Sequence, residues 1–242
     1  MTTVPDATKT LALDIWADVA CPWCWIGEHR LRAALERFRA VRPEVQVTRA
    51  WRPFQLQPQL PPGGVEWETF AREKFGGTER MDTMFAHVTA AGASDGLRFR
   101  FDRMTVAPNT ADAHRLILWA QHAAPRAGTR AAEALAGDGD AAGTRAMAMA
   151  DALFRAYFAE GRNVSDREVL TDAAVSLGLD GGAARAMLDG HAYEADVRGS
   201  QREAQRLGVQ GVPFIVLENR LAISGAQPAE LFDRARVAAL KE

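Results

Sequence analysis

Hydrophobic residues near the start of the chain first alternate with polar or small residues and then recur at helical spacing. The alternating stretch predicts a strand whose apolar positions are Leu11, Leu13, Ile15 and Val19. The helical spacing predicts about four turns of helix from residue 21 toward Val41, with an apolar stripe at Leu31, Ala34, Leu35 and Phe38. A second strand is predicted from the alternation of Val45, Val47, Arg49 and Trp51. The order strand, helix, strand at this length predicts a parallel pair of strands with a right-handed crossover.

The next part of the chain, residues 59–191, has mostly helical spacing. Prolines and glycines concentrated in residues 58–64 predict a linker at its start. Three apolar stripes predict helices, the first behind a cap at Asn109 and the last behind Ser165, which heads a capping box with Glu168. Residues 123–143 are rich in Ala and Gly, and we expect them to form a loop or a poorly ordered helix.

The C-terminal part returns to mixed structure. Its pattern predicts a helix at 195–207, a buried strand at 212–217, a tight turn at Asn219–Arg220, a returning strand at 221–224 and a final helix from Pro228 through Leu240. The two mixed segments, residues 10–58 and 192–242, together have the size of a typical single domain. We therefore predict a discontinuous α/β domain into which an all-helical domain, residues 59–191, is inserted.

Composition and charge argue against several classes of protein. The 242 residues include 29 basic and 31 acidic side chains, a formal net charge of −2. A net charge that small gives no electrostatic footprint for nucleic acid or an anionic membrane, and we expect neither as a partner. No apolar stretch approaches the ~20 residues that a membrane span requires. The N-terminal residues lack the charged and then apolar pattern of a secretory signal, so we expect a cytoplasmic protein.

The chain has two cysteines, Cys21 and Cys24, which stand at the predicted junction of the first strand and the first helix. Residues i and i+3 in a first helical turn lie on nearly the same face, so their sulfurs can form a disulfide with little backbone movement. The unpaired N–H groups and the positive dipole end of a helix N-terminus favour a thiolate there. We expect Cys21 to be exposed and to attack, and Cys24 to be covered and to resolve the mixed disulfide.

Two other interpretations of the cysteine pair stay open. A zinc site requires four ligands, but the chain has no second cysteine pair, and its five histidines show no paired spacing, so we expect no metal. The cysteines could also be buried and inert. A proline after the first cysteine at a strand-to-helix junction favours redox chemistry, which is typical of a C-x-x-C pair near a β-α-β unit.

The sequence also resembles a known family. Cys21-Pro22-Trp23-Cys24 at the first β-α junction and Gly211-Val212-Pro213-Phe214 much later are similar to the DsbA-like branch of the thioredoxin superfamily, and most similar to its FrnE-type proteins. Further residues that carry the resemblance are 18–27, 52–56, Asn109, 113–116, 152–158, 208–213 and 224–227. The resemblance implies an α/β, thioredoxin-like fold with an inserted all-helical domain. It also implies dithiol–disulfide exchange, for which we expect no cofactor.

The chain departs from the family pattern in two places. Trp23 stands where periplasmic DsbA proteins typically have a histidine, so the Cys21 thiolate lacks one stabilising group. Some FrnE-type proteins have a further cysteine pair near the C-terminus, and this chain has none. We therefore expect weaker oxidising power than that of periplasmic DsbA. Whether the protein oxidises, reduces or isomerises disulfides stays open.

The resemblance implies roles for residues besides the cysteines. It makes Pro213 a cis-proline opposite the cysteines, so that the Val212 backbone faces them and pairs with an extended substrate. Pro22 and Trp23, between the cysteines, complete the expected substrate-binding residues, and we expect the Trp23 side chain to be exposed. The expected partners are protein or small-molecule thiols and disulfides, with glutathione as one candidate.

Four polar residues have two interpretations each. Asp18 could relay the proton of Cys24, but a capping or solvated position is favoured. Glu28 could act as a general base, but a solvated helical glutamate is favoured. Asn109 and Arg115 could face the cysteines, but ordinary cap and surface positions are favoured.

Two other functions also stay open. Glutathione-dependent isomerases of the hydroxychromene carboxylate type and kappa-class transferases share this architecture. They usually have serine where Cys21 stands and lack the second cysteine, so the intact pair argues against them. The other alternative is a non-enzymatic role, in which the helical insertion binds a partner.

Overall fold

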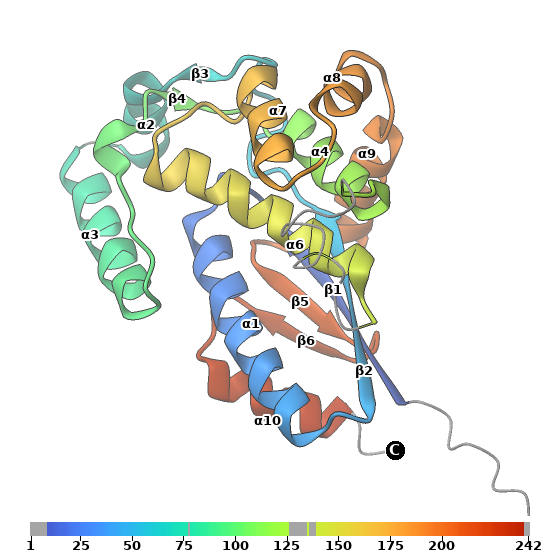
Figure 1. Ribbon diagram of the computed structural model, residues 1–242. Coiled ribbons are helices and arrows are strands. Elements are labelled where there is room, and N and C mark those ends of the chain that lie inside the picture. The colour runs from blue at the N-terminus through green and yellow to red at the C-terminus, as the bar shows by residue number, and fades with distance from the viewer. Residues whose placement is uncertain (1–8, 77, 126–134, 136–138, 240–242) are drawn as a thin grey trace, which may run out of the picture.

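The structure, a computed structural model, has a single four-stranded sheet at its centre (Figure 1). It describes residues 9–76, 78–125, 135 and 139–239. The strand order is β2-β1-β5-β6, formed by β1 (Lys9–Ala17), β2 (Val45–Pro53), β5 (Phe214–Leu217) and β6 (Leu221–Ser224). Strands from both ends of the described chain therefore meet in one sheet.

The first two strands and the helix between them follow the sequence prediction. β1 and β2 are parallel, with Leu13 opposite Arg49, and α1 (Pro22–Val41) connects them. β1 ends at Ala17, two residues before the predicted end. On its other side, β1 pairs with β5 in the antiparallel direction, with Ile15 opposite Ile215.

The hairpin between β5 and β6 is present, but its turn is displaced by one residue from the prediction. Glu218 and Asn219, rather than Asn219 and Arg220, occupy the centre of the turn, and both have a φ of 52°. With Leu217 opposite Leu221, residues 218–220 form a three-residue connection, and positive φ at two successive residues lets the chain reverse that tightly. The final helix, α10 (Ala229–Ala239), then packs against α1.

Most of the chain between β2 and β5 is helical, as predicted. Its helices are α2 (Trp67–Phe75), α3 (Thr78–Ser94), α4 (Ala111–His122), α6 (Ala141–Phe154), α7 (Arg167–Ser176), α8 (Gly181–Asp189) and α9 (Glu194–Arg206). A π-helical turn, Arg155–Ala159, continues α6, and a 3-10 turn spans Phe101–Arg103. Figure 1 shows α6 across the top of α1, which it contacts, with α2 and α3 to one side.

Two details of this helical part differ from the prediction. Strands β3 (Val65–Glu66) and β4 (Val106–Ala107) form a small antiparallel ribbon, which is too short to produce a visible alternation. The cap of α7 is Asp166, whose carboxylate accepts from the Glu168 N–H, because the Ser165 hydroxyl is engaged by the Asn109 backbone instead. Most of the predicted weak segment, 123–143, lies outside the described residues.

The N-cap of α4 is Thr110, one residue after the predicted cap, but the capping bond comes from Asn109, whose side-chain oxygen accepts from the Ala111 N–H. Among the helices that the structure describes, none combines the length and the apolar character that a bilayer span requires.

Candidate active site

The two cysteines lie where β1 leads into α1. After Ala17 the chain turns, and the Cys21 N–H donates to the Asp18 carbonyl at 3.0 Å. Cys21 is the N-cap of α1, and Pro22 is its first residue, where the missing N–H of proline is not needed. Both thiols are free, and the Cys24 N–H donates to the Cys21 carbonyl at 3.0 Å. The pair therefore occupies the first turn of the helix, as the sequence predicted.

The expectation that Cys21 is exposed is wrong. Its exposed fraction is 5%, against 2% for Cys24. Cys21 instead lines a cavity of about 220 Å³, and Cys24 is not among the residues that line it. The cover comes from α2 and α3, which are distant in the sequence and therefore invisible to local pattern. The two sulfurs still differ in access, because only Cys21 borders the cavity.

The cavity beside Cys21 is almost entirely apolar. Side chains from α1, α2, α3 and the π-helical turn form its walls, among them Trp23, Trp67, Phe70, Phe85, Phe101 and Tyr157. Lys74 brings a positive charge to this lining, with its ammonium 5.3 Å from the centre of the Phe70 ring. Trp23 is half-buried rather than exposed, because its ring packs edge-on against His87 at 5.4 Å.

The Val212-Pro213 segment lies against Cys21. The Val212-Pro213 peptide bond is cis, as the resemblance implied. The Cys21 thiol donates to the Val212 carbonyl, with 3.4 Å between Sγ and the oxygen. Pro213 packs on Gly27 of α1 so closely that a Cβ at Gly27 would lie 2.9 Å from Pro213 Cγ. The Val212 backbone therefore lies directly beside the Cys21 sulfur.

Cys24 is held in the protonated form. Burial raises the pKa of the Cys24 thiol well above its usual value, and the neighbouring Cys21 raises it further. The backbone of Asp18 opposes this and lowers the Cys24 pKa by a hydrogen bond, while the Asp18 charge raises it. Cys24 is thus a thiol in the reduced protein at neutral pH.

Asp18 is buried, not solvated, with an exposed fraction of 1%. Its carboxylate accepts from the N–H groups of Ala20 at 3.2 Å and Leu56 at 2.7 Å. The first bond fixes the turn before Cys21, so the capping half of the favoured interpretation is correct. The second joins that turn to the segment after β2.

His114 of α4 completes the surroundings of Asp18. It is fully buried, and its Nε2 lies 3.4 Å from Asp18 Oδ1. The Trp51 indole N–H donates to His114 Nδ1 at 3.2 Å, so a neutral imidazole has its proton on Nε2, toward Asp18. No role at the site was predicted for His114. Its position three residues before Ile117, on the apolar side of its helix, was the only sign in the sequence that it is buried.

The structure does not bring Asn109 and Arg115 to the cysteines. Arg115 is buried and donates to backbone carbonyls of residues 187, 188, 190 and 192, which fixes the chain after α8 onto α4. A surface position for Arg115 was therefore a wrong expectation. Asn109 donates to the Leu60 carbonyl in addition to its capping bond.

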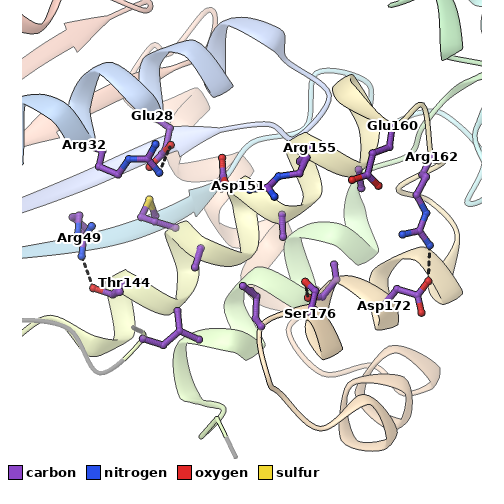
Figure 2. Close-up of a pocket in the computed structure, with 17 residues that line it drawn as sticks. Glu28, Arg32, Arg49, Thr144, Asp151, Arg155, Glu160, Arg162, Asp172 and Ser176 are labelled. Carbon is purple, nitrogen blue, oxygen red and sulfur yellow. Dashed lines mark hydrogen bonds and ion pairs between the residues drawn. The ribbon is translucent and has the colours of Figure 1, made fainter. Parts of the chain in front are cut away.

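Glu28 is another residue whose expected solvation is wrong. Its side chain is 9% exposed, because α6 covers this face of α1. Burial raises the pKa of Glu28. Figure 2 shows Glu28 at the edge of a second pocket, which lies between α1, α6 and α7.

The chain matches a known protein family along most of its length. Residues 12–148 and 139–236 match the family described as "DSBA-like thioredoxin domain". Among solved structures, the chain is similar to the probable DsbA oxidoreductase SCO1869 from Streptomyces coelicolor, with 35% identity, a TM-score of 0.76, and coverage of 96% of this chain and 91% of that one.

Two further proteins are similar at lower identity, one in its solved structure and one in its sequence. The cytosolic disulfide reductase DsbM from Pseudomonas aeruginosa, solved with GSH, has 24% identity, a TM-score of 0.57, and coverage of 94% of this chain and 99% of that one. The uncharacterized protein YwbO of Bacillus subtilis (strain 168) is 22% identical over 239 residues, 93% of this chain and 96% of its own length.

Proposed function

Because the chain belongs to the DSBA-like thioredoxin domain family, we propose that it is a thiol–disulfide oxidoreductase of the FrnE type, with Cys21 as nucleophile and Cys24 as resolving thiol. The fold is the α/β, thioredoxin-like fold with inserted helices. One observation supports the assignment of roles most strongly. Cys21 borders an open cavity at a helix N-terminus, whereas Cys24 lies behind it as a buried thiol.

The proposed reaction has two exchange steps. In the reducing direction, the Cys21 thiolate attacks one sulfur of a substrate disulfide, the substrate S–S bond breaks, and the leaving thiolate takes up a proton. Cys24 then loses its proton and attacks the Cys21 sulfur of the mixed disulfide, which releases the second substrate thiol and leaves a Cys21–Cys24 disulfide. The reverse sequence oxidises a substrate dithiol. In both directions the reacting Cys21 sulfur stands at the positive dipole end of α1.

We propose that Pro22, Trp23, Val212 and Pro213 bind the substrate. The Val212 carbonyl, already in contact with the Cys21 sulfur, can accept from the backbone of an extended peptide. The apolar cavity favours a substrate with an apolar group beside its sulfur. Protein or small-molecule thiols and disulfides are the proposed partners, glutathione among the candidates. We also propose the domain division 10–58 with 192–242, and 59–191.

The first test replaces each cysteine by serine. Cys21→Ser should abolish reduction of a polypeptide disulfide, because the attacking thiolate is gone. Cys24→Ser should accumulate a mixed disulfide through Cys21, detected by non-reducing electrophoresis and mass spectrometry, because the resolving step is lost. If both variants trap substrate equally well, the assignment of roles is wrong. If neither changes the exchange rate, the proposed function is wrong.

A further inference from the structure

A buried carboxylate oxygen on α1 lacks a hydrogen-bond partner among the residues that the structure describes. It is Oε2 of Glu28, four residues after Cys24. The side-chain nitrogens of His29 and Arg32 stand 3.9 Å from this oxygen, beyond hydrogen-bond distance. Burying a carboxylate oxygen without a donor or a cation in contact is costly. Glu28 therefore points to a ligand that the chain itself does not supply.

Two neighbouring side chains present ligand atoms to the same place. His29 Nε2 lies 3.3 Å from Oδ1 of Asp151, a residue of α6. The ligand atoms of Glu28, His29 and Asp151 all lie within 4.8 Å of one another. Figure 2 shows Glu28 and Asp151 on the facing helices α1 and α6, at the same pocket. Two carboxylate oxygens and one imidazole nitrogen form a ligand set suited to a divalent first-row metal ion.

The ligands also have the outer contacts that orient metal-binding side chains. The Trp25 indole N–H donates to Asp151 Oδ1 at 2.8 Å. The Trp25 ring is itself fixed among Phe99, Phe154 and Phe158. Such second contacts hold a ligand in position and raise metal affinity. The direction of the Asp151 carboxylate is therefore set before an ion arrives.

Two arginines reach into the same space. Arg32 Nη2 lies 3.1 Å from His29 Nδ1, and Arg155 Nη2 lies 3.3 Å from Asp151 Oδ2. Their side chains are 43% and 62% exposed, so both guanidinium groups can turn into solvent. Arg32 is the closer competitor, because it faces both His29 and Glu28. An incoming dication would displace it.

We propose that Glu28, His29 and Asp151 bind a divalent transition-metal ion, represented by Zn²⁺, at a site separate from the cysteine pair. Three protein ligands leave a further coordination position open toward the pocket. The ion links the helix that begins at the cysteines to α6. No metal was predicted from the sequence because the histidines show no paired spacing, whereas His29 and Asp151 are 122 positions apart.

The test uses a protein without thiols, because the cysteine pair could bind zinc itself. In the Cys21→Ser, Cys24→Ser protein, calorimetric titration with Zn²⁺ should show one bound ion per chain. Bound Co²⁺ should show the visible absorption bands that are typical of this ion with four or five ligands. Glu28→Gln and Asp151→Asn should each weaken binding by more than about tenfold, the smallest effect expected when a metal-orienting group is removed.

Two further variants test whether Zn²⁺ binding depends on the three proposed ligands and not on the general charge of the pocket. Glu160→Gln changes an acidic residue of the same pocket outside the ligand set, and should leave the Zn²⁺ affinity unchanged. Arg32→Gln removes the competing cation and should tighten binding. The proposal is overturned if no stoichiometric Zn²⁺ binds, if Glu28→Gln and Asp151→Asn behave like Glu160→Gln, or if Arg32→Gln weakens binding.

A folding control accompanies each variant. Zn²⁺ should raise the melting temperature of the thiol-free parent, because an ion bound only by the folded state stabilises it. The same ion should leave the melting temperatures of folded Glu28→Gln and Asp151→Asn unchanged; a rise equal to that of the parent would count against the site. None of these measurements involves a cysteine, so they do not test the proposed exchange reaction.

Discussion

At the scale of single residues, Asp18 determines the geometry of the turn that precedes Cys21. Its buried carboxylate receives two backbone N–H groups, from Ala20 and Leu56, and faces the Nε2 of His114. The two backbone groups donate to it, and the imidazole nitrogen lies 3.4 Å from its Oδ1. A carboxylate suits this position because it only accepts hydrogen bonds, whereas an amide would turn two N–H donors toward some of the same groups.

Asp18→Asn should therefore destabilise the fold. We expect the free energy of unfolding to fall by about 1–3 kcal/mol, the range for an unsatisfied buried polar group. Urea denaturation followed by circular dichroism measures it. The matched control is Asp14→Asn on β1, whose carboxylate pairs with the 40% exposed Arg52 and should contribute less than about 1 kcal/mol. Equal effects of the two substitutions would mean that Asp18 is not the organising residue.

Relations between residues close in the sequence could be predicted here, but burial by distant elements could not. The spacing of Cys21 and Cys24 was sufficient to place both on the first helical turn, because that relation is local. Glu28 was expected in solvent, as is usual for a glutamate in a helix. Its burial depends on α6, whose sequence is more than a hundred positions away. Local periodicity contains no information about such a neighbour.

At the scale of elements, α1 packs closely against the segment that leads into β5, beside Cys21. Gly27 leaves room for the proline ring, and a Cβ there would also lie 3.6 Å from the Cα of Ala226. The Val212 carbonyl follows the position of Pro213 because the two residues are adjacent. Helix α1 therefore sets both the cysteine sulfur and the backbone proposed to receive the substrate.

Gly27→Ala should separate these two functions of α1. The added methyl group must displace the Pro213 ring, so the Val212 carbonyl should move away from Cys21 Sγ. We expect exchange with a polypeptide disulfide to fall more than the reaction of Cys21 with iodoacetamide, as measured by the ratio of the two rates. The overpacked contact should also lower the free energy of unfolding by about 1–3 kcal/mol.

Gly199→Ala on α9 is the control for this substitution. A Cβ at Gly199 meets only the end of the flexible Arg202 side chain, at 3.9 Å. Its higher helix propensity should raise stability by up to about 1 kcal/mol without changing either rate. If Gly27→Ala leaves the ratio of rates at the parental value, the Val212 backbone does not guide the substrate.

Elements were easier to predict than their partners. The alternation in β1 and β2 and the stripe of α1 were long enough to identify type and parallel pairing. The two-residue strands β3 and β4 were missed because two positions cannot show a period. The cap of α7 was assigned one residue early because Ser165 and Asp166 are both good capping residues, and only the tertiary contact with Asn109 decides between them.

At the scale of the whole molecule, the cavity at Cys21 exists because the helical part of the chain closes over the end of the sheet. Phe85 of α3 stacks on Phe101 with 4.0 Å between ring centres and lies 6.0 Å from Trp67. These rings are part of the wall of the cavity that Cys21 borders. None of them is near Cys21 in the sequence, so the cover could not be predicted from the cysteine motif.

The wall makes access to Cys21 depend on the size of the reagent. In the Cys24→Ser background, where Cys21 is the remaining thiol, a small alkylator such as iodoacetamide should react readily and a bulky maleimide slowly. Phe85→Ala should increase the rate with the bulky reagent severalfold and leave the rate with the small one nearly unchanged, because it widens the entrance without touching the sulfur. Phe85→Leu keeps most of the side-chain volume and should change the rate of reaction with the bulky maleimide less.

Removing Phe85 also removes packing, so folding must be measured alongside. We expect Phe85→Ala to lower stability by roughly 1–3 kcal/mol, below the loss at a fully buried phenylalanine because the ring is only partly covered. If the folded variant reacts with both reagents at the parental ratio, Cys21 is reached by another path, and the apolar cavity does not select the substrate. If the ratio rises as expected, the helices inserted between the strands determine which disulfides reach the nucleophile, and the cysteine motif alone does not.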